Sequence, residues 1–356
     1  MLMTPGPTAV PEPVRNAMSR KLINPDVDPK FQRIYDRLID RLATVYGINT
    51  ADTEHSVVVP GGEGILGLEA TIASLVESGT EVLCLSNGLY GDGFADFVEA
   101  YGGKVTLVSA EYDEPLPLGA LERVLTDGEA EFDVATMVHC ETPTGTLNDI
   151  DPALDLLNEA GVLTVVDAVS SLGGIPVPTD RIDVCLGASQ KCFSAPPGLT
   201  TAAISDHAWA AMKERDPHSL YTNFLPWRDT DDGFPYTHLT TNVVALDEAV
   251  SLLSEEGLDE TYARHEAAAA RCRERGAELG LVPYPGADRS APTVTAFRVP
   301  GRAGDIQQAL HEEHDVLVAT GLADLADDVL RIGHMGHAAR LDRVDETMDA
   351  LAAVVE

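Results

Sequence analysis

The sequence is poor in lysine and in positive charge. Only five of its 356 residues are lysine, and 24 Lys and Arg residues stand against 58 Asp and Glu residues, which gives a formal net charge of −34. Because such a surface repels polyanions and anionic lipids, we expect no nucleic-acid partner and no membrane partner. An acid-rich, lysine-poor surface is also typical of proteins from salt-loving organisms, where screening weakens the self-repulsion. An ordinary acidic cytosolic protein is the alternative.

The sequence also lacks long apolar runs and closely spaced cysteine pairs. No apolar run approaches the roughly 18 residues that a membrane span needs, and the start, MLMTPGPTAVPEP, lacks the basic segment and apolar core of a signal peptide. We therefore predict a cytoplasmic protein. The five cysteines lie mostly in apolar runs, never as C-x-x-C, and their number is odd. This pattern predicts buried thiols and argues against a disulfide framework and a metal site of the zinc type.

Predicted strands and helices alternate from about residue 30 to residue 205. The strands are almost unbroken apolar runs, as in buried parallel sheets, and the helices between them have apolar residues at helical spacing. This alternation predicts an α/β fold with a doubly wound sheet. The predicted strands are 81–87, 104–111, 133–140, 162–168, 181–190 and 199–205, and the helices are 31–47, 67–79, 93–103, 118–128 and 151–161.

The pattern changes after residue 205. A loop-like stretch rich in Asp and Pro leads into two long predicted helices, 243–257 and 258–280, followed by shorter alternating strands and helices to residue 356. We predict a large domain over residues 16–239 and a smaller C-terminal α/β domain over 240–356. Residues 1–15 are predicted to pack near the small domain as an extended segment, because their prolines disfavour a helix.

A glycine-rich turn follows an apolar run in the segment SVVVPGGEGILGLEA, residues 56–70. Its spacing, Gly62-x-Gly64-x-x-Gly67, matches the dinucleotide fingerprint, but the acidic residue expected about 20 positions later is misplaced. The alternative prediction of an NAD-dependent dehydrogenase therefore rests on this spacing alone. A glycine turn that opens a helix can bind any phosphate, since the first N–H groups of the helix are free and its dipole favours an anion.

One lysine stands between apolar segments in GASQKCFSAPPGL, residues 187–199. Burial would lower the pKa of the Lys191 amine and make it a candidate for an imine with a carbonyl group; the alternative is a surface lysine at a strand end. Asp167 ends a strongly apolar predicted strand, where side chains enter the crevice that binds ligands in α/β proteins. A lysine for an imine and a carboxylate for a pyridine nitrogen together suit pyridoxal phosphate.

These segments resemble the central motifs of class V, fold type I pyridoxal-phosphate-dependent aminotransferases, in the alanine–glyoxylate and serine–pyruvate branch. With these two segments included, seven segments similar to family motifs occur along the chain in the order found in the family: PGPT, GGEG, NGLYG, HCETPTG, VVDAVSSLGG, GASQKCFSAPPG and RIGHMG. The resemblance implies a large domain with a mostly parallel, seven-stranded sheet and a smaller C-terminal α/β domain. It also implies a homodimer with shared active sites.

The resemblance also implies a role for each matching residue. Lys191 would form the Schiff base with the cofactor, Asp167 would contact the pyridine nitrogen, and Tyr90 and Val169 would pack on the two ring faces. Arg331 would bind the substrate carboxylate, with a bidentate geometry that lysine cannot match. The remaining cofactor contacts would come from Glu63, Gly64, Ile65, Thr142, Gln190 and, across the dimer, Thr237.

Three segments depart from the family pattern. Glu63 occupies the phosphate turn, where relatives more often carry a small or hydroxyl residue, and is expected to point outward, because a carboxylate repels phosphate; Ile65 stands where they often have Thr or His. Thr237-His238-Leu239 replaces a Thr-Pro-Pro segment, which weakens the prediction that Thr237 contacts the cofactor across the dimer. The segment INPDVDPKF replaces another family motif, and its Asn24 is expected to contact substrate.

The predicted reaction is transamination between a small amino acid, alanine or serine, and a 2-oxo acid, glyoxylate or pyruvate. A cysteine desulfurase shares the fold, but that branch carries a histidine just before the lysine, where this chain has Gln190. A non-catalytic binding protein would be expected to have lost the lysine. Several assignments keep an alternative: Tyr90 as an ordinary core aromatic, Arg331 as a surface charge, His139 as a core residue, and His334 and His337 as residues lining the substrate pocket.

Overall fold

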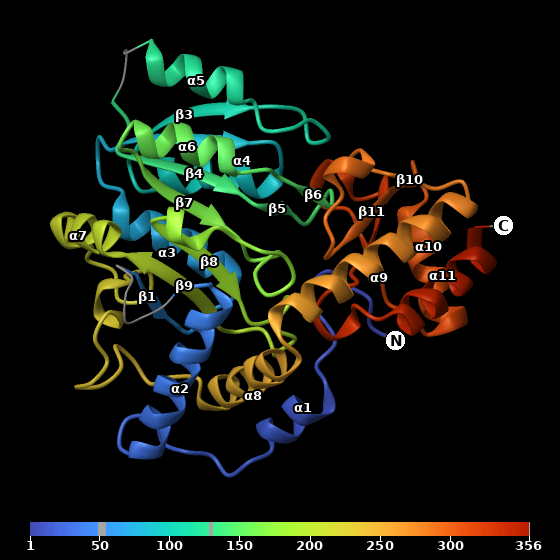
Figure 1. Cartoon of the computed structure of the whole chain (residues 1–356), viewed down its shortest axis with the longest axis horizontal. Helices are drawn as coiled ribbons and strands as arrows, with labels where there is room; N and C mark the ends of the chain where they lie inside the picture. The colour runs from blue at the N-terminus through green and yellow to red at the C-terminus, as the bar shows by residue number, and fades with distance from the viewer. Residues whose placement is uncertain (49–54, 128–130, 356) are drawn as a thin grey trace.

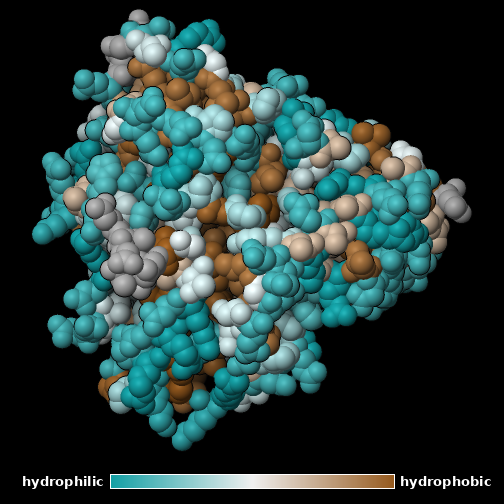
Figure 2. All heavy atoms as spheres, in the orientation of Figure 1, coloured by the Kyte–Doolittle hydropathy of each residue, from teal (hydrophilic) through white to brown (hydrophobic). Residues whose placement is uncertain are grey.

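The computed structural model describes residues 1–48, 55–127 and 131–355. The last positions of two predicted helices, Gly128 and Glu356, lie outside these residues. Figure 1 shows a larger unit, coloured blue to yellow, beside a smaller orange-to-red unit formed by the C-terminal part of the chain. The face drawn in Figure 2 carries hydrophilic side chains over most of its area, in keeping with the acidic composition.

The larger unit is built on a seven-stranded sheet with the order β1-β9-β8-β7-β4-β2-β3. Strand β9 is antiparallel to both of its neighbours, and the other adjacent pairs are parallel. The prediction of a mostly parallel α/β sheet is therefore confirmed. The strands are β1 (His55–Val58), β2 (Glu81–Ser86), β3 (Lys104–Ser109), β4 (Val134–Val138), β7 (Leu163–Asp167), β8 (Val184–Ala188) and β9 (Thr200–Ser205).

The central strands of this sheet are buried on both faces. Because side chains alternate along a strand, Val82 and Cys84 of β2 belong to one apolar cluster while Leu83 and Leu85 belong to the cluster on the opposite face. Burial on both faces explains why the strand sequences are nearly continuous apolar runs. The helices of this unit are α2 (Pro29–Val45), α3 (Gly64–Leu75), α4 (Leu89–Ala100), α5 (Leu118–Thr126), α6 (Asp151–Glu159) and α7 (Asp206–Arg215).

The smaller unit has a four-stranded antiparallel sheet of order β10-β11-β13-β12. Helix α8 (Thr240–Glu256) packs on α1 (Glu12–Met18) and on α2, whereas α9 (Leu258–Glu278) packs on α11 (Leu341–Val355) and on strand β11 (Thr295–Arg298). The remaining elements are α10 (Ala303–His314), β10 (Val282–Pro283), β12 (Ala319–Thr320) and β13 (Val329–Ile332).

The N-terminal segment differs in part from its prediction. Residues Glu12–Met18 form helix α1, so the expectation of an extended segment is wrong from residue 12 onward. Pro13 lies in the first turn, where a helix needs no N–H group from it. Before this helix the chain runs along the small sheet, where Met3 donates its N–H to the Leu317 carbonyl.

All five cysteines are free and buried, as their apolar surroundings predicted. Within the described residues, no helix is both long enough and apolar enough to cross a membrane.

Candidate active site

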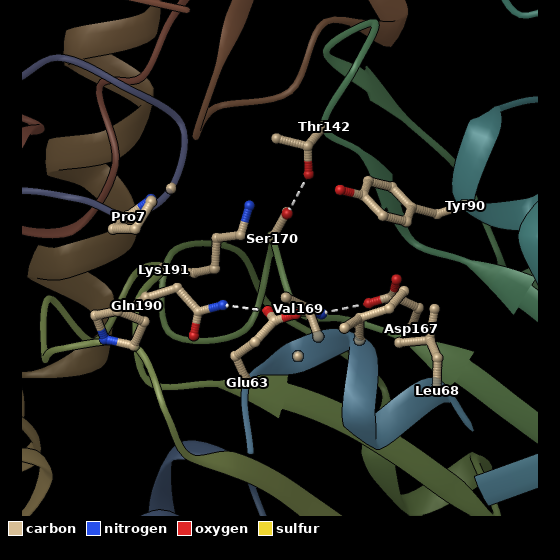
Figure 3. A pocket seen from close by; sticks show the side chains of 14 residues that line it. Pro7, Glu63, Leu68, Tyr90, Thr142, Asp167, Val169, Ser170, Gln190 and Lys191 are labelled. Atoms are coloured by element: carbon tan, nitrogen blue, oxygen red, sulfur yellow. Dashed lines mark hydrogen bonds between the residues drawn. The ribbon is translucent and has the colours of Figure 1, made fainter. Parts of the chain in front are cut away.

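A cavity of about 490 Å³ opens at the carboxyl edge of the large sheet. Parallel strands bring their carboxyl ends to one edge, so the residues that follow β7 and β8 meet there with the start of α3. Figure 3 shows Lys191, Asp167 and Tyr90 turned toward this space from different elements. The residues that line it are Gly6, Pro7, Glu63, Gly64, Ile65, Leu68, Tyr90, Thr142, Asp167, Val169, Ser170, Gln190, Lys191 and Pro197.

Lys191 lies three residues beyond the end of β8, in a tight loop. The loop is closed by hydrogen bonds from the Ala195 N–H to the Ser189 carbonyl (3.0 Å) and from the Ser194 N–H to the Lys191 carbonyl (2.9 Å). Burial is the main cause that lowers the pKa of the Lys191 amine, to about 8; the negative charge of Asp167 opposes this shift and the positive charge of Arg331 adds to it. An amine of lowered pKa is the nucleophile that imine chemistry requires.

Asp167 is the last residue of β7 and is almost fully buried. One carboxylate oxygen, Oδ1, accepts a hydrogen bond from the Val169 N–H at 2.8 Å. Burial raises the pKa of this carboxyl to about 6, whereas the Val169 hydrogen bond and the charge of Lys191 lower it. A carboxylate that is poorly solvated by its surroundings gains from a cationic partner, which a protonated pyridine nitrogen would provide.

Tyr90 and Val169 form two walls of the same cavity. Tyr90 belongs to the first turn of α4, and burial raises the pKa of its phenol. Thr142 and Ser170, which both line the cavity, share a hydrogen bond between their hydroxyls (Figure 3). The ring-binding residues predicted from the sequence are thus brought together from three separate parts of the chain.

The glycine turn lies at the start of α3, with Gly64 and Ile65 as its first helical residues. Their N–H groups have no partner within the helix and are free to bind an anion. Gly64 is closely packed, because an added Cβ would lie 3.1 Å from Val169 Cγ1 and the valine would have to shift by a few tenths of an ångström.

Glu63 does not point outward as predicted. Its Oε2 accepts a hydrogen bond from Gln190 Nε2 at 2.9 Å, and both side chains line the cavity (Figure 3). The amide of Gln190 binds the carboxylate at the cavity edge, which makes this orientation favourable. The other amide atom, Gln190 Oε1, is buried without a hydrogen-bond partner among the described residues.

These residues fit the pyridoxal ring and provide N–H donors for a phosphate. Lys191, Asp167, Tyr90 and Val169 supply the amine, the carboxylate and the two walls that the ring needs. The carboxylate of Glu63, the residue just before α3, opposes a phosphate there.

Arg331 lies in β13 of the small sheet and is 7% exposed. Its Nε donates to the Thr320 carbonyl at 2.6 Å, and its Nη1 approaches the carbonyl of the cavity residue Thr142 at 3.5 Å. Burial lowers the pKa of the guanidinium, and the nearby phenol of Tyr90 opposes that shift. The alternative of a surface charge is therefore wrong.

Two predicted residues lie away from the cavity. Thr237 Oγ1 donates to Asp26 Oδ2 at 3.2 Å, and Asn24 Oδ1 accepts the N–H of Asp26 at 2.9 Å. Asp26 thus joins two segments that are more than 200 residues apart in the sequence. Thr237 is exposed, and neither it nor Asn24 contributes to the lining of the cavity in this chain.

The histidines His139, His334 and His337 do not line the cavity. His139 is buried against the Ser171 hydroxyl at 2.9 Å, and burial lowers its pKa to about 4, so the core alternative describes it. His334 is fully buried, with Nε2 2.7 Å from Thr295 Oγ1. His337 is half-buried, and its N–H donates to Ser194 Oγ at 2.7 Å.

Sequence reasoning missed several residues at the site. Ser170 and Glu141 lie inside quoted motifs, next to assigned residues, but nothing in their spacing indicates a side-chain role. Glu141 contacts the α4 turn that carries Tyr90, and Pro5 accepts a hydrogen bond from Lys191 Nζ at 2.7 Å.

The chain is similar to known proteins over nearly its whole length. The family model described as aminotransferase class-V matches residues 30–340. A pyridoxamine–pyruvate transaminase from Mesorhizobium japonicum is 33% identical over 95% of this chain and 87% of its own length. An alanine–glyoxylate aminotransferase from Rattus norvegicus is 29% identical over 100% of this chain and 87% of its own. The crystal structure of an alanine–glyoxylate aminotransferase from Nostoc sp. superposes with a TM-score of 0.93, at 28% identity, covering 100% of this chain and 95% of that one.

Proposed function

The chain belongs to the aminotransferase class-V family, and we propose that it transfers the amino group of alanine or serine to glyoxylate or pyruvate. It is a pyridoxal-phosphate-dependent aminotransferase that acts on amino acids and 2-oxo acids. The dehydrogenase suggested by the glycine spacing is therefore wrong. The observation that carries the substrate proposal is the approach of Arg331 to a cavity that holds a half-buried lysine amine and a buried carboxylate.

The cofactor supplies an electron sink for the bond broken at the substrate α-carbon. Lys191 Nζ would hold the cofactor through its aldehyde and, when free, would take the α-proton of the substrate and return it. Its lowered pKa keeps a useful fraction of the amine neutral near pH 8. Asp167 would keep a proton on the ring nitrogen, and Arg331 would orient the substrate through its carboxylate.

Six further predicted residues would hold the cofactor in place. Tyr90 and Val169 would exclude water from the ring faces, and Thr142 would donate toward the ring hydroxyl. Gly64 and Ile65 present N–H groups at the phosphate end, with Gln190 beside them.

A matrix of donors and acceptors tests this proposal. The purified protein, loaded with pyridoxal phosphate, is assayed with alanine and serine against glyoxylate and pyruvate, and with aspartate and phosphoserine as comparison donors. Turnover confined to the small donors supports the proposal, and preference for aspartate or phosphoserine contradicts it. Lys191→Ala serves as the control, because it removes the amine on which turnover depends.

A second candidate donor is pyridoxamine, favoured by the position of Glu63. A carboxylate at the phosphate end repels a phosphate dianion but can accept a hydrogen bond from a neutral hydroxymethyl group. Pyridoxamine–pyruvate transaminase is the printed name of the relative that is 33% identical. Rates with pyridoxamine and with its 5′-phosphate, each against pyruvate, decide between the candidates. A faster reaction with the unphosphorylated amine supports the second.

We also infer a homodimer in which each chain contributes to both sites. The exposed pair of segments joined by Asp26 supports this, because Thr237 and Asn24 lie on one surface away from their own cavity. Mixing inactive Lys191→Ala chains with Thr237→Ala chains of reduced activity tests it: recovery of activity on mixing requires shared sites. Sedimentation shows independently whether two chains associate.

We also infer a cytoplasmic protein from a salt-loving organism, and the acidic, lysine-poor composition supports the second point. Activity and thermal unfolding measured from 0.1 to about 3 M KCl test the second point. An increase in the unfolding temperature with salt over this range is expected for a chain of net charge −34.

A further inference from the structure

The segment Pro5–Thr8 crosses the site beside Lys191 and contacts both its backbone and its side chain. Lys191 Nζ donates to the Pro5 carbonyl at 2.7 Å. Thr8 Oγ1 donates to the Lys191 carbonyl at 3.0 Å, and the Thr8 N–H donates to the neighbouring Gln190 carbonyl at 3.0 Å. Figure 3 shows the amine extended toward the segment that carries Pro7, away from Asp167.

The same segment is fixed to the small sheet at its other end. The Met3 N–H donates to the Leu317 carbonyl at 2.8 Å, and the Gly333 N–H donates to the Met3 carbonyl at 2.7 Å. Gly333 follows Arg331 by two residues, and an added Cβ there would come within 2.3 Å of the Thr4 carbonyl carbon. Residues 3–8, called here the N-terminal strap, therefore connect the loop of Lys191 to the strand of Arg331.

The carbonyl of Pro5 meets a chemical need of the free amine. An ammonium group taken out of water requires an acceptor, and a hydrogen bond from a cation is stronger than a neutral one. Pro5 is buried, so its carbonyl lacks full solvation and gains from the same contact. A lysine that binds a carbonyl compound must leave this acceptor and return to it when it is released.

We propose that the Pro5 carbonyl is the resting acceptor of the free Lys191 amine, and that the N-terminal strap positions this amine relative to Arg331. The inference rests on the proposed function for its catalytic meaning, because the amine alternates between a bound and a free position only if it forms an imine with a carbonyl compound. The contact itself belongs to the ligand-free protein and can be tested there.

A substitution at Gly6 can test the contact between Lys191 and the Pro5 carbonyl. The Gly6 φ of +127° favours glycine, and an added Cβ would lie 2.7 Å from both Cε and Nζ of Lys191. Gly6→Ala should therefore displace the amine from Pro5. Gly79→Ala is the matched control, because Gly79 also has a positive φ, of +95°, but has no atom within 4 Å of an added Cβ.

The experiment measures the pKa of Lys191 in the ligand-free protein by NMR of ¹³C-methylated lysines. The chain has only five lysines, so a Lys191→Arg sample assigns the signal. In the wild type, titration near pH 8 is expected. Loss of the Pro5 acceptor removes a stabiliser of the cation, so Gly6→Ala should lower the pKa by about 1 unit. Gly79→Ala should leave the pKa unchanged.

A second variant guards against misfolding of Gly6→Ala. Thr8→Val removes the hydroxyl that holds the strap to Lys191 without adding a clash, and it should shift the pKa in the same direction by a smaller amount. Circular dichroism confirms that each sample is folded. A folded Gly6→Ala or Thr8→Val protein whose Lys191 pKa equals that of the wild type overturns the proposal. Absence of transamination by the wild type would contradict the proposed function and leave this titration result unaffected.

Discussion

The carboxylate of Glu141 accepts hydrogen bonds from the backbone N–H groups of Gly91 and Tyr90, at 2.7 and 3.2 Å. Both donors lie in the first turn of α4, where no intrahelical acceptor is available to them. Glu141 is fully buried, and burial raises the pKa of its carboxyl to about 8. Since Thr142 is the next residue, one short segment fixes the helix that carries Tyr90 and also provides a cavity residue.

Replacement of Glu141 should weaken binding of the ring. Glu141→Ala leaves two buried N–H groups without an acceptor, at a cost of about 1–3 kcal/mol each in the free energy of unfolding. Tyr90 should then lose its fixed position, and the Kd for the cofactor should rise about 10-fold. Glu141→Gln keeps one acceptor oxygen and should have the smaller effect. Absorbance titration with the cofactor and urea unfolding measure the two quantities, and equal Kd values for Glu141→Ala and wild type contradict the assignment.

Much of the site could be predicted because it depends on local pattern and on a general property of parallel sheets. Asp167 and Lys191 follow buried apolar strands, and the carboxyl ends of such strands meet at one edge. The side-chain contacts that do not follow from this rule were missed. Glu141 bonds a helix 50 positions earlier, and the carboxylate of Glu63 turns toward Gln190, 127 positions later.

The contact of Pro5 with Lys191 was missed for the same reason. It joins residues 186 positions apart, through a backbone carbonyl that any residue type would supply. The sequence alone gives no measure of such long-range contacts. The error at helix α1 was of a different kind, because proline disfavours the interior of a helix but is tolerated in its first turn, where Pro13 lies.

Asp167 should lower the stability of the ligand-free protein at neutral pH. Its pKa is raised from 3.8 to about 6, so between these pH values the native state binds more protons than the unfolded state. The free energy of unfolding therefore falls as pH rises through this window, and the loss persists above pH 6. Asp167→Asn lacks this titration and should exceed the wild type at pH 7 by about 2–3 kcal/mol, while losing activity.

Urea unfolding of the ligand-free proteins at pH 4, 5 and 7 tests this prediction. The difference between Asp167→Asn and wild type should grow with pH. The exposed Asp96, replaced by Asn, is the matched control and should show no such growth. A difference that is constant across the three pH values would contradict the raised pKa.

Arg331 should act through its planar guanidinium rather than through its charge alone. Arg331→Lys keeps the positive charge but loses bidentate binding of a carboxylate. We expect the KM for the amino acid to rise about 10- to 100-fold, with a smaller change in kcat. Arg298→Lys, on the adjacent strand β11 and 40% exposed at its side chain, is the control and should leave both constants near wild type. An unchanged KM in Arg331→Lys would assign carboxylate binding to another group.

Glu63 should set the preference between phosphorylated and unphosphorylated ligands. Its carboxylate lies beside the free N–H groups of α3, so removing its charge relieves repulsion of a phosphate. Glu63→Gln keeps a side chain of the same shape that can still bond Gln190. We expect the Kd for pyridoxal phosphate to fall about 10-fold or more and the Kd for pyridoxal to rise or stay constant.

Absorbance titrations with both ligands measure this preference, at low salt and again at about 1 M KCl. Screening should reduce the effect of the substitution at the higher salt, because the repulsion is electrostatic. Glu122→Gln, an exposed carboxylate on α5, is the control for net charge and should leave the preference unchanged. If Glu63→Gln and Glu122→Gln both retain the wild-type ratio of the two Kd values, Glu63 does not select the ligand. The second candidate donor, pyridoxamine, then loses the observation that favours it.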